Sequence, residues 1–183
     1  MNESDLAARS KLPKLMDFSG LAPVFNEYCE DIEDIAQWIT ERIAEIETLV
    51  NTNSNEEQIL PSIVVLVKEE LDVVPMAKKL TEYLEEFNLK AIACSQGQSV
   101  GSAHDVRVCS IEYIKGLEFE AVFFVGIDEL IQRYPDLYQK FLYVGSTRAA
   151  NYLGLTCTDE LPSELEELRP YFGENWNMDQ LNF

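Results

Sequence analysis

One stretch of the sequence, YIKGLEFEAVFFVGIDEL (residues 113–130), contains residue types that act on nucleotides, but their order is unusual. Lys115 and Gly116 come before an apolar run, and the acidic pair Asp128 and Glu129 follows it. A phosphate-binding P-loop has the pattern GxxxxGK[ST], in which the lysine follows the glycines and a helix comes next. The stretch therefore lacks a phosphate cradle, and any ATP chemistry in this chain needs phosphates that are held elsewhere.

A second stretch, FLYVGSTRAA (residues 141–150), carries an arginine on a segment that is predicted to be helical. Leu142, Gly145 and Arg148 follow one another at three-residue steps and so share roughly one face of a helix. A glycine in the middle of that face permits close packing and leaves the arginine side chain free to reach outward. The alternative is that Arg148 is a surface cation favoured by the dipole at a helix end.

The composition indicates one ordinary globular domain. The chain has 183 residues, of which 46% are apolar and 26% are charged, and a chain of this length can bury a sizeable core. Its longest apolar run is too short to span a membrane, and we expect no membrane association and no signal peptide. Four cysteines lie far apart and there is one histidine, His104, so we expect a reduced, cytoplasmic protein without a metal site.

The charge balance argues against independent binding to nucleic acid. The formal net charge is −19, and such a chain repels a phosphodiester backbone. Any contact with DNA must therefore be local or be supplied mostly by another domain. The acidic surface is also compatible with the binding of another protein.

Hydrophobic periodicity predicts alternating strands and helices. Strands are expected at 23–29, 62–67, 90–94, 106–111, 121–127 and 152–157, and helices at 32–50, 72–87, 136–150 and 162–169. Alternation of this kind predicts an α/β fold of three layers with a mostly parallel sheet between helices. Ligands of such sheets bind at the carboxyl ends of the strands. We therefore expect Ser110, Glu118 and Lys68 to gather at one edge, with Gly116 allowing a sharp turn between the first two.

At these residues the sequence resembles a known family. SIEYIKGLEFEAVFFVGIDEL, followed by FLYVGSTRAANYLGL, is similar to the last two motifs of the UvrD/Rep/PcrA helicases of superfamily 1, and SIVVLVKEE resembles their motif IV strand. The similarity covers roughly residues 23–157. It implies a second RecA-like motor domain at 21–160, after a flexible segment at 1–20 and before a C-terminal helix and tail at 161–183 that pack on the domain.

The resemblance explains the missing P-loop. In that family the ATP site is split between two RecA-like domains, and the first domain holds the phosphates. The resemblance therefore implies that ATP and Mg²⁺ bind only together with an upstream RecA-like domain of the same protein. The pair Asp128 and Glu129 would imitate the magnesium-binding acidic pair of that first domain without replacing it.

The resemblance also implies roles for single residues. Arg148 would be the arginine that reaches the γ-phosphate across the cleft, and Glu118 would bind the ribose hydroxyls. Lys115 and Gly116 would shape the turn that presents Glu118. Lys68 stands where the family usually has a second phosphate-reaching arginine, and a lysine loses the bidentate geometry of an arginine. The alternative without a binding role is that Glu118 is a solvated turn residue and Lys68 is a surface charge at the end of a strand.

Two further positions are implied to contact single-stranded DNA. Ser110 matches the threonine of the family motif, whose hydroxyl can contact the strand backbone; it could equally be an ordinary strand hydroxyl. Glu112 stands where the family usually has histidine, and a carboxylate there would repel a phosphate. This departure weakens the implied coupling to DNA.

Two functions therefore remain open at this level. The first is the C-terminal motor domain of an ATP-dependent DNA helicase or translocase, inactive by itself, with single-stranded DNA as a partner of the full-length protein. The second is a degenerate, non-catalytic helicase-like domain that serves as a protein-interaction module. The motifs KGLEF and TRA favour the first, whereas the acidic surface, Lys68 and Glu112 favour the second.

Overall fold

The six strands of the described chain form one parallel sheet. The computed structural model describes residues 21–52, 60–114 and 116–177. The expected segment 1–20 and Lys115 lie outside these ranges. The order of the strands across the sheet is β1-β6-β5-β2-β4-β3, and every neighbouring pair is parallel. The strands are β1 (Val24–Asn26), β2 (Ile63–Val67), β3 (Ala91–Ala93), β4 (Val106–Ser110), β5 (Phe119–Phe124) and β6 (Ala149–Thr156).

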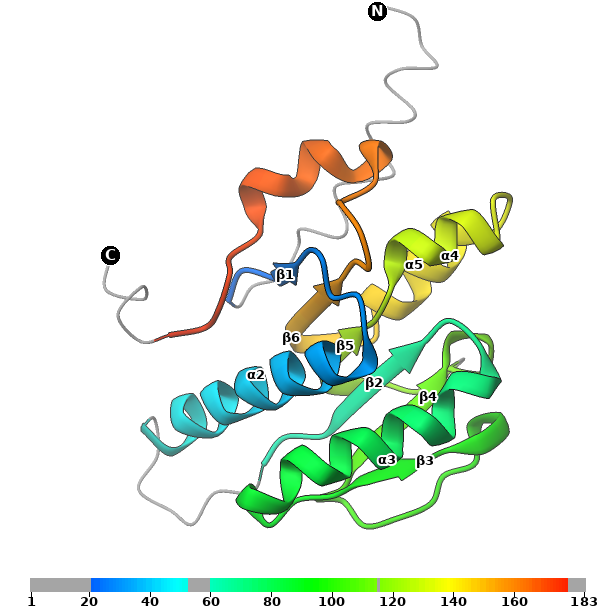
Figure 1. The fold of residues 1–183 in the computed structure, drawn as a ribbon. Helices are drawn as coiled ribbons and strands as arrows, with labels where there is room; N and C mark the ends of the chain where they lie inside the picture. The colour runs from blue at the N-terminus through cyan, green and yellow to red at the C-terminus, as the bar shows by residue number, and fades with distance from the viewer. Residues whose placement is uncertain (1–20, 53–59, 115, 178–183) are drawn as a thin grey trace, which may run out of the picture.

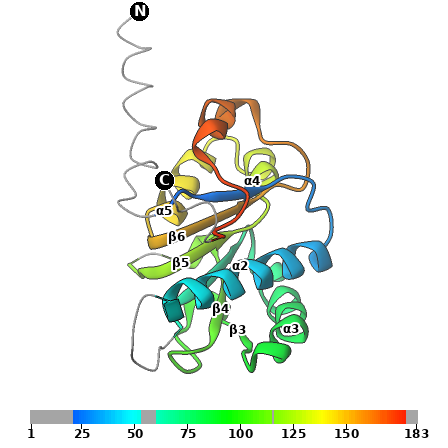
Figure 2. The same ribbon diagram turned by 90° about the vertical axis from the view of Figure 1, so that its left-hand side faces the viewer.

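Helices cover both faces of this sheet, so the predicted three-layer α/β architecture is confirmed. One face carries α2 (Ile32–Thr52) and α3 (Val73–Leu84), and the other carries α4 (Ile127–Arg133) and α5 (Tyr138–Ser146), as Figures 1 and 2 show. Short 3₁₀ turns complete the connections: η2 (Glu70–Asp72), η3 (Glu85–Phe87), η4 (Ser95–Gly97), η5 (Ile111–Tyr113) and η6 (Ser163–Tyr171).

The central strand β2 shows how the sequence builds two cores. All five of its residues are buried, which is typical of a parallel strand covered on both faces. Ile63, Val65 and Val67 point into the core under α2 and α3. Val64 and Leu66 point into the second core, under α4 and α5. The alternation follows from the two-residue period of a strand.

Several boundaries differ from the predictions, and two of them bear on the site. The strand expected at 121–127 is β5, and it ends at Phe124, because Gly126 adopts a left-handed conformation with φ 65° and α4 begins directly after it. The backbone N–H of Gly126 donates to the hydroxyl of Thr156 at 3.1 Å, which fixes this turn. The helix expected at 136–150 is α5, which ends at Ser146, because Ala149 already pairs with Phe119 in the sheet.

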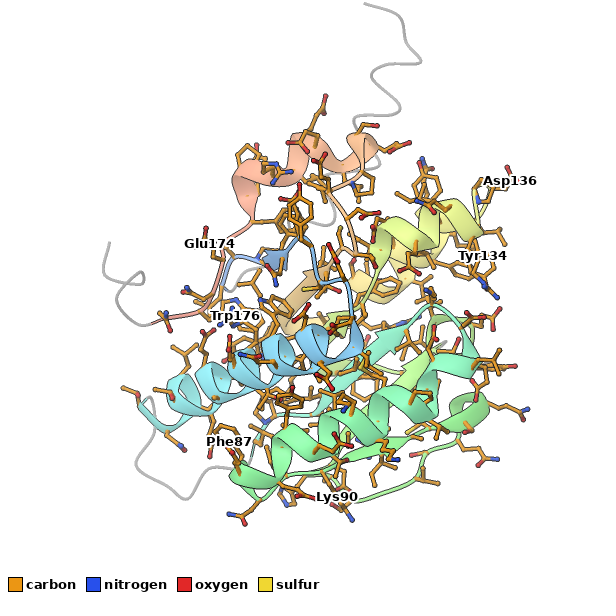
Figure 3. The ribbon with its side chains drawn as sticks, viewed as in Figure 1. Phe87, Lys90, Tyr134, Asp136, Glu174 and Trp176 are labelled. Atoms are coloured by element: carbon orange, nitrogen blue, oxygen red, sulfur yellow. The ribbon has the colours of Figure 1, made fainter. Side chains whose placement is uncertain are left out.

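The C-terminal segment packs back on the domain. Gly173 forms a parallel bridge with Val24 beyond the edge of β1. Trp176 is 4% exposed and meets the rings of Phe123 and Tyr152 edge to face. Figure 3 shows its side chain above α2. Trp176 thus holds the described end of the chain against the domain. Within the described residues, no helix has the length and apolar character needed to cross a membrane.

Candidate functional site

Glu118 and Arg148 lie next to each other at the amino ends of two paired strands. Glu118 directly precedes β5 and Arg148 directly precedes β6. The backbone N–H of Phe119 donates to the carbonyl oxygen of Arg148 at 2.9 Å, so the sheet ladder itself holds the two positions together. The two motif residues that the resemblance assigns to one nucleotide are therefore neighbours in space, although 30 positions separate them in the sequence.

The guanidinium of Arg148 is incompletely satisfied. Its Nε atom is buried and has no hydrogen-bond partner among the described residues, and no described carboxylate pairs with the guanidinium within salt-bridge distance. Glu118 is exposed and also makes no described ion pair. A buried donor without an acceptor costs free energy. An anion that binds at this edge of the sheet would supply such an acceptor, and the flat fork of an arginine suits phosphate oxygens.

Gly145 fixes the distance between α5 and the sheet. A Cβ atom at this position would lie 2.8 Å from two ring carbons of Phe124 and 3.3 Å from the side chain of Ile111. Only glycine allows this approach, as predicted for the face shared with Leu142. The prediction that Arg148 continues the same helix is wrong, because α5 ends at Ser146 and Arg148 belongs to the turn into β6.

Gly116 has the conformation that the turn before β5 requires. Its φ is 79°, in the region that favours glycine, and a Cβ atom there would meet nothing within 4 Å. The position therefore needs a glycine for backbone reasons and has open space around it. The role expected for Lys115 falls outside the described residues.

The prediction that Ser110, Glu118 and Lys68 gather at one edge is wrong. Lys68 and Ser110 do lie together. Lys68 directly follows β2, Ser110 is the last residue of β4, and Val67 at the end of β2 is level with Ser110. Glu118 lies at the opposite edge. Ile63 is level with Ala121, which puts Phe119 level with position 61, seven residues before Lys68. That separation is about 23 Å at roughly 3.3 Å per residue.

The physical reason lies in the parallel sheet. A residue that precedes a strand and a residue that ends the previous strand occupy opposite edges whenever both strands run in the same direction. The chain between Ser110 and Phe119 must therefore cross the whole sheet. Lys68 and Arg148 consequently face different surfaces and cannot reach the same phosphate group.

At the carboxyl edge, the cation and the acidic pair are already engaged. Lys68 forms an ion pair with Glu129, and Glu129 also accepts a hydrogen bond from the hydroxyl of Thr158 at 2.6 Å. Asp128 is 6% exposed and accepts the backbone N–H groups of Thr158 and Asp159, both at 2.9 Å. Asp128 thus fixes the turn after β6. Both carboxylate oxygens of Asp128 accept backbone hydrogen bonds, so they are not free to bind a metal ion in this arrangement.

Ser110 and Glu112 are also bound locally. The Ser110 side chain is fully buried, and its hydroxyl oxygen accepts the backbone N–H of Glu112 at 3.3 Å, which caps η5. Glu112 is exposed and accepts a hydrogen bond from the hydroxyl of Tyr134 at 3.2 Å. In this arrangement the hydroxyl of Ser110 cannot touch a nucleic-acid backbone without a local rearrangement.

A small cleft of 140 Å³ opens at the carboxyl edge, beside Lys68 and Glu129. Its floor is apolar and includes Ile35, Val67 and Met76, whereas Glu30, Asp31, Asp72 and Glu129 supply carboxylates around it. Lys68 is the only basic residue among those that line it. Burial raises the pKa of Asp72, and the neighbouring Glu69 acts in the same direction, although Lys68 opposes both. No three His, Cys, Asp or Glu side chains are placed to hold a metal ion anywhere in the described ranges.

Sequence reasoning missed most of these contacts at the carboxyl edge. The link from Asp128 to Thr158 joins positions 30 apart. The fork between Arg169 and Glu27, at 2.6 and 3.2 Å, joins positions 142 apart. Arg169 lowers the pKa of Glu27. Charge alone could not identify these pairs, because acidic residues outnumber basic ones 33 to 14.

The all-parallel sheet of six strands between helices is consistent with a RecA-like domain. Comparison with known proteins shows which family the sequence resembles. Residues 105–156 match the family model described as the UvrD-like helicase C-terminal domain. The match contains both KGLEF and TRA, so this segment of the chain is similar to a UvrD-like helicase C-terminal domain. The resemblance inferred from these motifs is thereby confirmed.

A solved structure has the same fold. It is the C-terminal domain of a possible DNA helicase from Lactobacillus plantarum WCFS1, with a TM-score of 0.61 and 18% identity over 84% of this chain and 89% of that chain. At this identity the similarity concerns the fold alone. No curated protein matches the sequence significantly.

Proposed function

We propose that this chain is the C-terminal motor domain of an ATP-dependent DNA helicase or translocase. In this proposal Arg148 contacts the γ-phosphate and Glu118 contacts the ribose of an ATP molecule. That ATP is bound between this domain and a first RecA-like domain of the same protein. The observation that carries the proposal is the pairing of the two motif residues at the amino edge, with a buried, unsatisfied nitrogen on Arg148.

The chemistry of Arg148 suits transition-state stabilisation. Phosphoryl transfer needs charge stabilisation on the equatorial oxygens, and an arginine supplied from a second domain is a known way to provide it. The close packing of α5 on Phe124, which depends on Gly145, sets the position of the turn that carries Arg148. A rigid support is what such a residue needs, because a small displacement of a positioning group lowers the rate strongly.

The residues present fit only part of an ATP site. The arginine fits a phosphate and the carboxylate fits ribose hydroxyls, but the sequence has no GxxxxGK[ST] pattern, which would form the phosphate cradle. Asp128 and Glu129, the acidic pair that imitates a magnesium site, are held by Thr158, Asp159 and Lys68. Mg²⁺ and the β- and γ-phosphates must therefore be bound by the first domain, and the isolated chain is inactive in this proposal.

The direct experiment compares ATP hydrolysis by a protein that contains both motor domains with hydrolysis by its Arg148→Ala variant. The proposal predicts a large loss in kcat at nearly unchanged ATP affinity and melting temperature. Unchanged hydrolysis together with a lower melting temperature would mean that Arg148 has a structural role, and the proposal would fail.

One observation favours a second candidate, a helicase-like domain that acts as a protein-interaction module. The three positions assigned to phosphate or DNA at the carboxyl edge are engaged elsewhere: Lys68 with Glu129, Ser110 with the η5 backbone and Glu112 with Tyr134. If hydrolysis is absent in the two-domain protein, this second candidate remains. Measuring DNA-stimulated ATP hydrolysis in the two-domain protein separates the two.

A further inference from the structure

The carboxyl edge carries the two most exposed large apolar side chains of the described chain. Leu71 in η2 is 82% exposed, and Val74 in the first turn of α3 is 59% exposed. They are three residues apart and flank the fully buried Val73. Exposed leucine and valine side chains near each other gain free energy when a partner covers them.

Acidic groups surround this apolar pair, and two nearby cations, Lys68 and Arg133, are already paired. In contrast, Lys78, one turn after Val74 on α3, is exposed and forms no described ion pair. Glu69 forms an ion pair with Arg133 at 2.6 Å, and Lys68 is paired with Glu129. Glu70 accepts the backbone N–H of Gln96 with one oxygen, at 3.0 Å. Its other oxygen is buried and has no partner among the described residues. The surface therefore has carboxylate oxygens in excess of the donors that the chain supplies.

The adjacent cleft has the same chemical character. It combines an apolar floor with carboxylates, and Asp72 belongs both to its lining and to the segment between Leu71 and Val74. The raised pKa of Asp72 shows that its charged form is poorly compensated in the folded chain. A positively charged group placed beside Asp72 would compensate the charge of its carboxylate.

We propose that residues 69–76, together with this cleft, form a docking surface for a protein segment that carries a large apolar side chain flanked by lysine or arginine. The apolar side chain packs on Leu71 and Val74, and the basic groups meet Asp72 and Glu70. Complementary charge selects the partner and speeds its association, whereas the apolar contact supplies most of the affinity. The proposal does not depend on the role of Arg148, because the two sites lie on opposite edges of the sheet.

The same features disfavour a nucleic acid at this surface. A phosphate backbone carries negative charge and is bound by free lysine and arginine side chains. Lys68 and Arg133 are paired with carboxylates, while Glu70 and Asp72 would repel phosphates. The edge that the family resemblance assigns to single-stranded DNA therefore has the electrostatics of a surface for a basic protein.

The test selects peptides from a random display library on the purified chain and measures their affinities as synthetic peptides. The expected peptides are rich in lysine or arginine and contain a large apolar residue. The double variant Leu71→Ser/Val74→Ser is expected to weaken binding by at least roughly tenfold, from the loss of buried apolar area. Glu70→Gln/Asp72→Asn is expected to weaken binding several-fold and to remove most of its dependence on salt.

Two matched controls keep the test specific. Glu82→Gln/Glu86→Gln removes the same number of charges near the other end of α3, and Phe87→Ser removes an exposed apolar side chain there. Figure 3 shows Phe87 at the end of the molecule opposite Tyr134, which contacts Glu112 of the carboxyl edge. Both controls should bind the peptides as the wild type does, and circular dichroism should show all variants folded.

Three results would overturn the proposal. The first is a selection that yields no binders, or binders without basic residues. The second is a set of peptides whose affinity changes as much in the controls as in the edge variants. The third is binding of an oligothymidine probe that competes with the peptides and is lost in Lys68→Ala, because the edge would then be a nucleic-acid site.

Discussion

The backbone N–H of Phe119 donates a hydrogen bond to the carbonyl oxygen of Arg148 at 2.9 Å, where β5 and β6 begin. This bond places the segment KGLEF beside the segment TRA at the amino edge of the sheet. Two motifs that are distant in sequence thus form one surface. Lys68, Ser110 and Glu112, in contrast, lie at the other edge, so the positions that the resemblance assigns to ATP and DNA are divided between two edges of the sheet.

Gly145→Ala should destabilise the domain although alanine is the better helix former. The new methyl group would lie 2.8 Å from the Phe124 ring, and overpacking of this kind costs about 1–3 kcal/mol, which exceeds the helix-propensity gain of at most about 1 kcal/mol. Chemical denaturation measures the change. Gly173→Ala is the matched control, since its nearest neighbour would be the carbonyl oxygen of Asn175 at 3.6 Å. Equal stability of the two variants would contradict the close packing of α5.

Trp176→Ala should be among the most destabilising single changes in the chain. The indole is 4% exposed, packs on Phe123 and Tyr152, and donates a hydrogen bond to the carbonyl oxygen of Ala22 at 2.9 Å. Removing a buried tryptophan side chain costs about 3–5 kcal/mol. Trp176→Phe keeps much of the apolar contact and should cost less. A loss below about 1 kcal/mol for the alanine variant would show that the C-terminal segment does not stabilise the fold.

Asp72→Asn should raise the stability of the folded chain at neutral pH. Because burial raises the pKa of Asp72 above its ordinary value of 3.8, the ionised carboxylate opposes folding, and the asparagine variant removes this opposition. The advantage over the wild type is present above the raised pKa and disappears as the pH falls toward 3.8. Denaturation curves of both proteins across this pH range give the comparison. A variant less stable than the wild type at neutral pH would contradict the assignment.

Lys68→Ala should leave ATP hydrolysis by the two-domain protein nearly unchanged. Lys68 lies at the carboxyl edge and pairs with Glu129, so it cannot share a phosphate with Arg148. The ion pair is partly exposed, and its loss should cost at most about 1 kcal/mol of stability. A decrease in kcat as large as that of Arg148→Ala would show that the two edges act on one nucleotide.

The architecture was predictable from the sequence because local patterns determine it. The continuous apolar run of β2 indicates burial on both faces, and the three- and four-residue spacing of isoleucines indicates α2. The close packing at Gly145 was also predictable, since a glycine on an apolar helix face indicates that another element approaches the backbone there. Element boundaries were less accurate near Gly126 and Ser146, where pairing with distant strands decides the end of an element.

The grouping of the site residues was not predictable in the same way. The expectation for Glu118 assumed that a short connection keeps its residues at one edge, whereas the parallel sheet forces the chain from Ser110 to cross to the other edge. The ion pair between Lys68 and Glu129 and the exposed position of Leu71 depend on tertiary contacts. The spacing of charges in a chain with so many carboxylates does not identify them.

The most direct test of the account concerns Arg148 in a protein that joins this chain to a first RecA-like domain. Steady-state ATP hydrolysis of the wild type, Arg148→Ala and Arg148→Lys is measured together with the melting temperature of each. We predict that kcat falls by roughly 10³–10⁵ in the alanine variant, that lysine restores little because it lacks the planar fork, and that the melting temperatures barely change. Hydrolysis at the wild-type rate in a variant that melts at a lower temperature would contradict the account.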